Sequence, residues 1–334
     1  MLCVDKPDYH FCTLFDSQFL LRGLTLFRSL ARYLQDFHFY VLCLDEGSYH
    51  TLKRLQQPHI IPLTLSDIEV WDPRLLKAKA NRSLIEYYFT LSPALPLYLL
   101  RNFDGIEVIT YLDADLFFYQ SPAPLFAELG QASILVIEHR FPAHLQDKLQ
   151  YGRFNVQYQS FRSTIQGLEC LEHWHQQCLE WCYDRLEAQR FADQKYLDRW
   201  PEWYDDLVIS QLKTAGLAPW NWANYRLRVQ KDRLLVDHDA LIFYHFHALK
   251  ILSTRLISHG MTDFGVMPLK YRRWLYAGYI KELTHTARWL QQKGIGSYPV
   301  QDRRIHFRVH DGRPGWSQWP GLLRRLWSQL MLIW

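Results

Sequence analysis

The first 112 residues of this 334-residue chain alternate between short apolar runs and longer segments with helical periodicity. Strand-like runs are predicted at residues 10–15, 37–44, 59–63 and 107–112. Helical patterns are predicted at 17–34, from about 48, and at 82–100, where Pro93 and Pro96 interrupt the pattern. Strands that alternate with helices are typical of βαβ units, whose strands form a parallel sheet. The pattern therefore predicts an α/β fold.

The second half of the chain has a different pattern. A strand is predicted at 132–138, helices at 162–188, 193–199 and 204–215, and strand-like runs within 233–246. The sequence contains no internal repeat and no low-complexity linker. We expect an α/β domain over residues 1–260 and a helical, basic and Trp-rich region over residues 261–334.

The positive charge is concentrated at the C-terminal end of the chain. The net charge is +4, and residues 301–334 contain six Arg and two Asp, so the preceding 300 residues are neutral overall. Enzymes that bind nucleic acid normally present a broad basic face. We therefore expect no nucleic-acid partner.

Targeting signals and cysteines indicate a cytoplasmic protein. The first residues lack the apolar core of a secretory signal, and no stretch reaches the roughly 18 apolar residues that a membrane span requires. The six cysteines show no regular spacing and are expected to be reduced. A zinc site is not expected from Cys170, His173, His175, Cys178 and Cys182, because consecutive turns of one helix rarely supply a closed tetrahedral site.

Two carboxylates, Asp113 and Asp115, directly follow the apolar strand at 107–112. In extended backbone, residues two apart point to the same side, so both side chains can converge on one cation. Carboxylate oxygens suit Mg²⁺ or Mn²⁺, and ligands of open parallel sheets bind beyond the carboxyl ends of the strands. The alternative is a turn in which one of the two Asp residues caps the next helix.

Three shorter motifs follow in order: Phe154-Asn155, Asp193-Gln194 and His245-Phe246. Together with the Tyr-Leu-Asp-x-Asp strand end, they resemble the GT-A-fold nucleotide-diphospho-sugar transferases. The resemblance is closest to the retaining family eight, which includes glycogenin and bacterial lipopolysaccharide galactosyltransferases, and it covers roughly residues 10–250. It implies a GT-A (Rossmann-like) nucleotide-sugar-binding sheet with a helical C-terminal elaboration.

The chain departs from the family pattern at two places. The family continues Phe-Asn with a small residue and Gly, whereas this chain has Val156 and Gln157. The family's His-Phe leads to Gly and then Lys-Pro-Trp, whereas this chain reads His-Phe-His-Ala-Leu-Lys and ends the motif at Lys250, one residue earlier.

The resemblance implies roles for residues near the reacting sugar. It places Gln194 beside the anomeric carbon, Asp193 on a sugar hydroxyl, and Asn155 in the same catalytic group. Asp193 also reads as the N-cap of a short helix, so a purely structural role stays open.

The residues expected to bind the metal and the nucleotide follow in part from the same resemblance. His245 and His247 are two residues apart and face one side, so either could join the two carboxylates around the metal; a pair of core histidines is the alternative. The crevice after the first strand holds the nucleoside base in GT-A folds, which implicates Thr13, Phe15 and Asp16. Basic groups near the phosphates are expected at Arg82 and Lys250.

The C-terminal segment 321–334 reads as a basic amphipathic helix. Arg324 and Arg325 share one predicted face, and Leu and Trp residues occupy the rest. This composition fits an anionic membrane surface, although a helix packed on the protein is the alternative. The stretch 218–224, rich in amides and indoles, is a possible sugar or acceptor surface.

These features, together with the resemblance, predict a metal-dependent hexosyltransferase, and the resemblance implies that it retains the anomeric configuration. It would use Mn²⁺ or Mg²⁺, a nucleotide-diphospho-sugar donor and a glycan or lipid-linked acceptor. One alternative is a nucleotidyltransferase of sugar phosphates, which would need a Gly-rich phosphate loop that residues 12–20 lack. Another is an inactive, membrane-associated nucleotide-sugar-binding protein.

Overall fold

The protein is built around one twisted sheet, as seen in a computed structural model that describes residues 8–302 and 330–332. The sheet has the strand order β3-β2-β1-β4-β7-β6-β8. Its strands are β1 (Tyr9–Phe15), β2 (Phe37–Cys43), β3 (Ile60–Thr64), β4 (Val108–Leu112), β6 (Ile134–Glu138), β7 (Phe154–Arg162) and β8 (Leu207–Ile209). All run in the same direction except β7, which is antiparallel to both of its neighbours.

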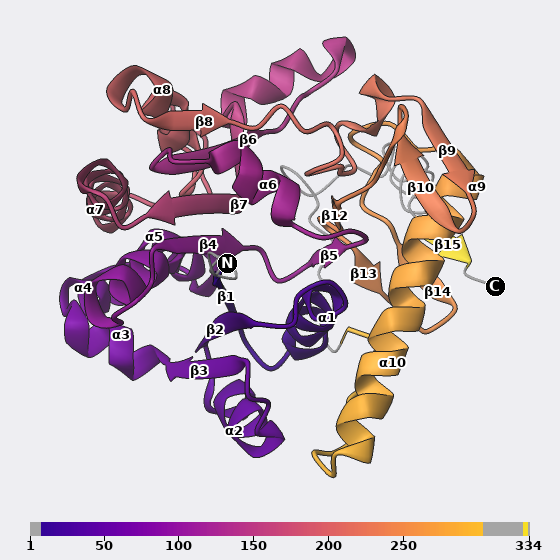
Figure 1. Cartoon of the computed structure of the whole chain (residues 1–334), viewed down its shortest axis with the longest axis horizontal. Coiled ribbons are helices and arrows are strands. Elements are labelled where there is room, and N and C mark those ends of the chain that lie inside the picture. The colour runs from indigo at the N-terminus through magenta and orange to yellow at the C-terminus, as the bar shows by residue number, and fades with distance from the viewer. Residues whose placement is uncertain (1–7, 303–329, 333–334) are drawn as a thin grey trace, which may run out of the picture.

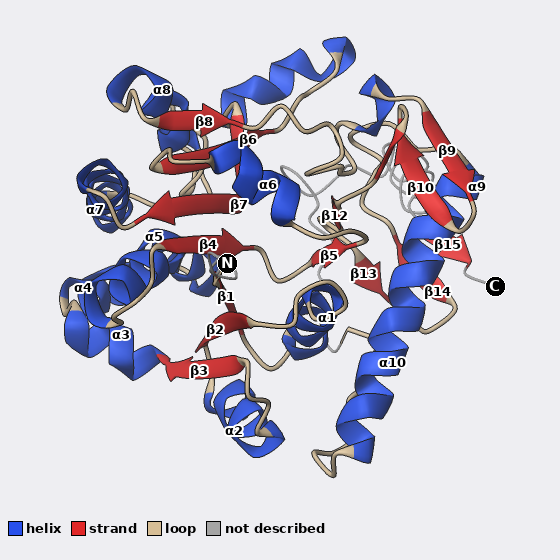
Figure 2. Cartoon of the chain, in the orientation of Figure 1, coloured by secondary structure: helices blue, strands red, loops and turns tan. Residues whose placement is uncertain are grey.

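Helices cover both faces of this sheet, as Figure 1 and Figure 2 show. The α-helices are α1 (Leu20–Leu30), α2 (Glu46–Leu55), α3 (Leu65–Trp71), α4 (Arg74–Asn81), α5 (Leu84–Asn102), α6 (Ala123–Leu129), α7 (Ile165–Glu180), α8 (Trp200–Trp203), α9 (Leu269–Arg272) and α10 (Gly278–Gln292). Short 3₁₀ turns lie at η1 (Ala143–Tyr151), η2 (Lys195–Arg199) and η3 (Trp222–Asn224), and a π turn at η4 (Arg273–Ala277).

The two faces of the sheet carry separate cores. Side chains alternate along β1, so Phe11 enters the core that α1 and α10 cover, and Cys12 enters the core beneath α5 and α7. α1 and α10 are also joined by a hydrogen bond of 2.8 Å between the hydroxyls of Thr25 and Thr286. This contact links the region before residue 260 to the region after it, and the proposed boundary there stays a prediction.

Three small sheets extend the main one. β5 (Leu116–Phe118) pairs with β12 (Phe243–His245) in antiparallel fashion. β9 (Leu227–Gln230), β10 (Arg233–Val236) and β11 (Asp239–Ala240) form a three-stranded sheet. β13 (Lys250–Ile251), β14 (Leu256–Ser258) and β15 (Leu330–Leu332) form another, in which the central strand β14 pairs with the C-terminal β15.

The α/β fold and its early alternation are confirmed, but the helix predicted at 204–215 was wrong and two other helices differ in detail from their predictions. Segment 204–215 holds β8 and irregular chain, because Leu207, Val208 and Ile209 add a strand to β6. The helix predicted at 162–188 is shorter, since β7 extends to Arg162 and Thr164 caps the helix by accepting from the Gly167 amide. α5 runs through both of its prolines without ending.

The terminal helix predicted at 321–334 was wrong for residues 330–332, which form β15. Met331 is only 4% exposed and belongs to the larger core. The remaining residues of that prediction, 321–329 and 333–334, lie outside the described part of the chain. Within residues 8–302 and 330–332, no helix is long and apolar enough to cross a membrane.

Candidate metal and donor site

The Asp-x-Asp motif lies where β4 ends and the chain turns into β5. The Asp113 amide donates to the carbonyl of Gln157 on β7 over 3.0 Å, and the Phe246 amide donates to the Asp115 carbonyl over 3.1 Å. These backbone bonds fix both carboxylates at the carboxyl edge of the sheet, where an α/β fold binds its ligands.

Pairing of β5 with β12 brings His245 to this edge, because His245 lies opposite Leu116. His245 Nε2 is 3.1 Å from Asp115 Oδ1 and 3.8 Å from Asp113 Oδ2. The ligand atoms of these three residues all lie within 4.8 Å of one another. Two carboxylate oxygens and one imidazole nitrogen form a donor set that fits Mn²⁺ or Mg²⁺.

The three side chains influence one another's charge. Burial, together with the charge of Asp115, raises the pKa of Asp113, although His245 partly offsets this. Burial opposes the charge of Asp115 as well, but His245 outweighs burial and lowers its pKa. Burial disfavours imidazolium at His245, yet the two carboxylates raise its pKa. The metal-free cluster therefore favours a protonated His245 beside a charged Asp115.

His247 lies next to this cluster but follows the end of β12. Its ring is 5.6 Å from the His245 ring, and its side chain is exposed. His247 is not among the three residues whose ligand atoms converge. The next residue, Ala248, has φ +56, and its Cβ sits 2.8 Å from where a Cβ on Gly260 would lie. In this turn, Ala248 with a left-handed backbone conformation, packed on Gly260, thus stands where the glycosyltransferase family that the sequence resembles has Gly.

Arg22 on α1 supports the segment that follows His247, and sequence reasoning missed it. Its guanidinium pairs with Asp302 at 2.8 Å and donates to the Leu249 carbonyl over 3.2 Å. The carboxylate of Asp302 also accepts from the Ile251 amide. The sequence signal for this role is that Arg22 lies on the otherwise apolar face of a predicted helix. A cation buried there needs a charged or polar partner.

The proposed catalytic amides lie in one hydrogen-bonded chain with His139, another residue that sequence reasoning missed. Asn155 Nδ2 is 2.9 Å from His139 Nε2 and 3.1 Å from Gln194 Oε1, and Gln194 Nε2 donates to the Tyr151 carbonyl over 3.0 Å. Burial lowers the pKa of His139 to about 3, so its ring is neutral. Its Nδ1 faces the Arg153 carbonyl, which only accepts, so Nε2 accepts from Asn155.

Trp220 lies between these hydrogen-bonded amides and the cluster of Asp113, Asp115 and His245. Its ring lies 5.2 Å from the ring of His139 and 5.3 Å from the rings of both His245 and His247. The indole is 3% exposed, and its N–H has no hydrogen-bond partner among the described residues. Trp220 belongs to the loop 218–224, where Asn221 anchors the backbone through the carbonyls of His139 and Gly216.

Asp193 is buried and interacts with both Asp113 and Ser92 of α5. Burial raises the pKa of Asp193 to about 7, and the nearby charge of Asp113 adds to this, while a hydrogen bond with Ser92 opposes it. Asp193 does not cap the following turn: the cap position belongs to Gln194, and no side chain caps there. The N-cap role considered for Asp193 was therefore wrong.

Gln157 is fully buried, and its side-chain amide has no hydrogen-bond partner among the described residues. Its Nε2 lies 2.9 Å from where a Cβ on Gly216 would be, and Gly216 has φ +78. The glycosyltransferase family that the sequence resembles has Gly at the position of Gln157. The larger side chain fits here because residue 216, which it packs against, is a glycine.

The three residues expected to contact the nucleoside differ in their burial and hydrogen bonding. Phe15 is 2% exposed and packs over Gly23 of α1, within the core. Thr13 is buried without a partner for its hydroxyl among the described residues. Asp16 accepts from the amides of Gln18 and Phe19 and so shapes the entry to α1.

The two expected basic groups are not alike. Arg82 donates to the Leu179 carbonyl over 2.7 Å and to the Thr90 hydroxyl, so it joins α5 to the end of α7. Lys250 is half-buried on β13, five residues after His245. The structure therefore gives Arg82 a structural role, and the phosphate role expected of Lys250 stays a prediction.

Comparisons with known proteins place this chain in a family. No family model matches it. It is 33% identical over 250 residues to the uncharacterized protein YfnD of Bacillus subtilis (strain 168), covering 74% of this chain and 80% of YfnD. The chain belongs to the YfnD family. A second member, the uncharacterized protein YfnF of the same organism, is 31% identical over 253 residues, covering 73% of this chain and 82% of YfnF.

Solved structures identify the fold of this YfnD-family protein. The galactosyltransferase LgtC in complex with donor and acceptor sugar analogs matches with a TM-score of 0.50 and 13% identity, covering 80% of this chain and 100% of LgtC. An active-site mutant of LgtC matches with a TM-score of 0.51 and 14% identity, covering 84% and 96%. The expected GT-A-type fold is confirmed.

Proposed function

We propose that this protein is a metal-dependent glycosyltransferase that moves a hexosyl group from a nucleotide-diphospho-sugar to a glycan or lipid-linked acceptor. The observation that carries the proposal is the convergence of Asp113, Asp115 and His245 at the carboxyl edge of a GT-A-type sheet. A bound Mn²⁺ or Mg²⁺ would stabilise the charge on the leaving diphosphate.

The residues around the metal site suggest how the donor is held. Lys250 follows His245 by five residues, and in this proposal its ammonium neutralises a phosphate of the donor. The unpartnered N–H of Trp220, beside three histidine rings, offers a donor to a ligand oxygen. Thr13 near the end of β1 and Asp16 directly after it are the proposed contacts to the nucleoside of the donor.

The amide chain suggests how the reacting carbon is stabilised. Neutral His139 orients Asn155, and Asn155 in turn orients the carbonyl of Gln194. A fixed carbonyl dipole beside the anomeric carbon would stabilise the positive charge that develops as the diphosphate leaves. Retention of the anomeric configuration and a hydroxyl contact from Asp193 belong to the same proposal.

The proposed place of action is the cytoplasmic face of a membrane. The excess positive charge lies after residue 300, where Arg and Trp residues could bind anionic lipid. Anchoring there would bring the site to a lipid-linked acceptor.

A panel of nucleotide-sugars, assayed with Mn²⁺, with Mg²⁺ and with EDTA, tests the activity. We expect metal-dependent hydrolysis or transfer of one donor, with release of the nucleoside diphosphate. Release of pyrophosphate from a sugar phosphate and a nucleoside triphosphate would instead indicate a nucleotidyltransferase. Donor binding without turnover for every acceptor and for water would indicate an inactive binding protein.

A further inference from the structure

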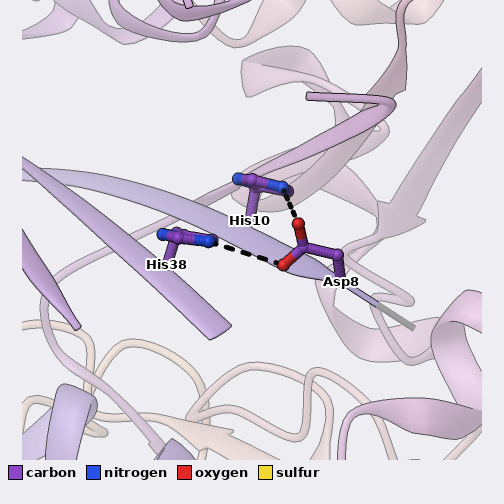
Figure 3. Close-up of side chains that lie close together, drawn as sticks. All are labelled: Asp8, His10 and His38. Carbon is purple, nitrogen blue, oxygen red and sulfur yellow. Dashed lines mark hydrogen bonds and ion pairs between the residues drawn. The ribbon is translucent and has the colours of Figure 1, made fainter. Parts of the chain in front are cut away.

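A second cluster of ligand-type side chains lies at the opposite end of the sheet. Figure 3 shows Asp8, His10 and His38, with both histidines directed at the carboxylate. His10 and His38 are register partners on the parallel strands β1 and β2, so their side chains leave the same face. Asp8 directly precedes β1.

The three side chains of this cluster lie close together. His10 Nε2 is 3.0 Å from Asp8 Oδ2, and His38 Nε2 is 3.6 Å from Asp8 Oδ1. The two imidazole rings are stacked, with centroids 4.7 Å apart and planes 11° apart. One ligand atom from each residue lies within 4.8 Å of the other two.

We propose that Asp8, His10 and His38 form a second metal site, which binds Zn²⁺ and ties the start of β1 to β2. Two imidazole nitrogens and a carboxylate oxygen favour a transition ion over Mg²⁺ or Ca²⁺. Three protein ligands leave a fourth position for water, and the exposed side chain of Asp8 gives access to it.

Tyr40 supplies a second layer to this site. Its hydroxyl is 3.3 Å from His10 Nδ1, and Tyr40 itself is buried on β2. A partner on Nδ1 fixes the ring and leaves Nε2 as the ligand atom, as is usual for histidines that bind metals. His10 is 5% exposed, so its ring is already held in place before an ion arrives.

The second site is separate from the Asp113 site. β1 and β4 are parallel, and His10 pairs with Ile109, near the start of β4, whereas Asp113 follows its end. The two sites therefore lie at opposite edges of the sheet. Zinc binding at the Asp8–His10–His38 cluster can therefore be measured in a protein whose Asp113 site has been removed by mutation. The inference does not depend on the proposed transferase activity.

Zinc titration of the full-length protein, purified without a His tag and stripped of metal, tests the inference. In an Asp113→Asn/Asp115→Asn background we expect one bound Zn²⁺ and a higher thermal midpoint with Zn²⁺ than without. Adding Asp8→Asn or His38→Ala should weaken binding by more than about 100-fold, because each removes a direct ligand. Tyr40→Phe should weaken it by about 10–100-fold, the usual effect of losing an outer-shell partner.

His50→Ala is the matched control, because His50 is exposed beside Glu46 but has no third ligand-type residue in a described cluster. It should leave zinc affinity unchanged. Asp8 and His38 are about half-exposed, so their variants should fold, which circular dichroism without zinc verifies. If the Asp113→Asn/Asp115→Asn protein binds no Zn²⁺, or binds equally well after Asp8→Asn and His38→Ala, the cluster is only an ion-pair network and the inference is wrong.

Discussion

Asn155 donates from Nδ2 to Gln194 Oε1 over 3.1 Å, although the two residues lie on different elements, β7 and the turn before η2. We expect Gln194→Ala to lower kcat by about 100-fold, the scale of losing one preorganised polar group at a reacting centre. KM for the donor should change little. Asn155→Ala should reproduce much of this loss, since it releases the Gln194 carbonyl.

Steady-state kinetics against the exposed control Gln291→Ala would check this prediction. Combining Asn155→Ala with Gln194→Ala should cost little more than the single variants, because the two residues act as one unit. A rise in KM at unchanged kcat would make Gln194 a binding residue instead.

Asp113→Asn and Asp115→Asn should each abolish measurable transfer while the fold is retained. Removing either carboxylate takes away a metal ligand and part of the charge that holds the cation. Asp104→Asn, an exposed carboxylate outside both clusters, is the matched control. Turnover measured with and without EDTA decides the matter: activity of the two variants that persists in EDTA would overturn the metal assignment.

His245 should release a proton when Mn²⁺ binds. The carboxylates raise its pKa in the metal-free protein, and the ion can use the ring only after it is deprotonated. Mn²⁺ affinity should therefore decrease as the pH falls through that raised pKa. Calorimetric titration in buffers of different ionisation enthalpy measures the proton, and His245→Asn should abolish both the proton release and most of the affinity.

His247→Asn is the companion variant, because His247 is adjacent to the cluster without joining its converging ligand atoms. It should alter Mn²⁺ affinity far less than His245→Asn does. The opposite ranking would transfer the ligand role to His247.

Asp193→Asn should stabilise the metal-free protein at pH 8 while impairing transfer. Burial raises the pKa of Asp193 to about 7 from its ordinary value near 4, so this residue's contribution to stability is fully present only at low pH. That contribution is lost as the pH rises to about 7. Thermal unfolding in EDTA should show a larger gain for the variant at pH 8 than at pH 4, by up to about 4 kcal/mol. An equal gain at both pH values would mean that Asp193 is not held neutral.

The basic tail can be tested without removing it. Arg324→Ala/Arg325→Ala should weaken cosedimentation with anionic vesicles by about tenfold or more, since each Arg near an anionic surface contributes about 1 kcal/mol. Transfer to a soluble acceptor should be unchanged. Vesicle binding that is unaffected by the two substitutions and by high salt would reject the membrane proposal.

Deleting residues 317–334 would not be a clean test of the membrane proposal. The deletion removes β15, whose Met331 lies in the core. Met331→Ala alone should cost about 2–5 kcal/mol of unfolding free energy. A truncated protein that fails to bind vesicles could therefore simply be unfolded.

The sequence predicted what depends on short-range patterns. Apolar runs such as residues 107–112 identify buried strands, and the two carboxylates after that run follow from their spacing. The helix expected at 204–215 failed because three residues with strand propensity add to the edge of β6, a tertiary contact that no local pattern reveals.

The residues that support the site, such as His139 and Arg22, could not be predicted because their contacts also depend on the tertiary structure. His139 lies at the end of β6 and reaches Asn155 only because β6 and β7 are neighbours, with a register irregularity after Val136. Arg22 and Asp302 meet across almost the whole length of the chain. Such pairs depend on topology, whereas His245 was found through the order of motifs in a known family.

The pairing of β14 with β15 joins two segments that are far apart in the sequence. β14 (Leu256–Ser258) follows His245 closely along the chain, and one of its two edges is covered by β15 (Leu330–Leu332). A polypeptide that lacked residues 330–332 would leave that edge open, with unpaired backbone groups on β14. Open edges of this kind recruit other chains and promote aggregation. β15 therefore protects the segment after His245 from self-association as well as extending the small sheet.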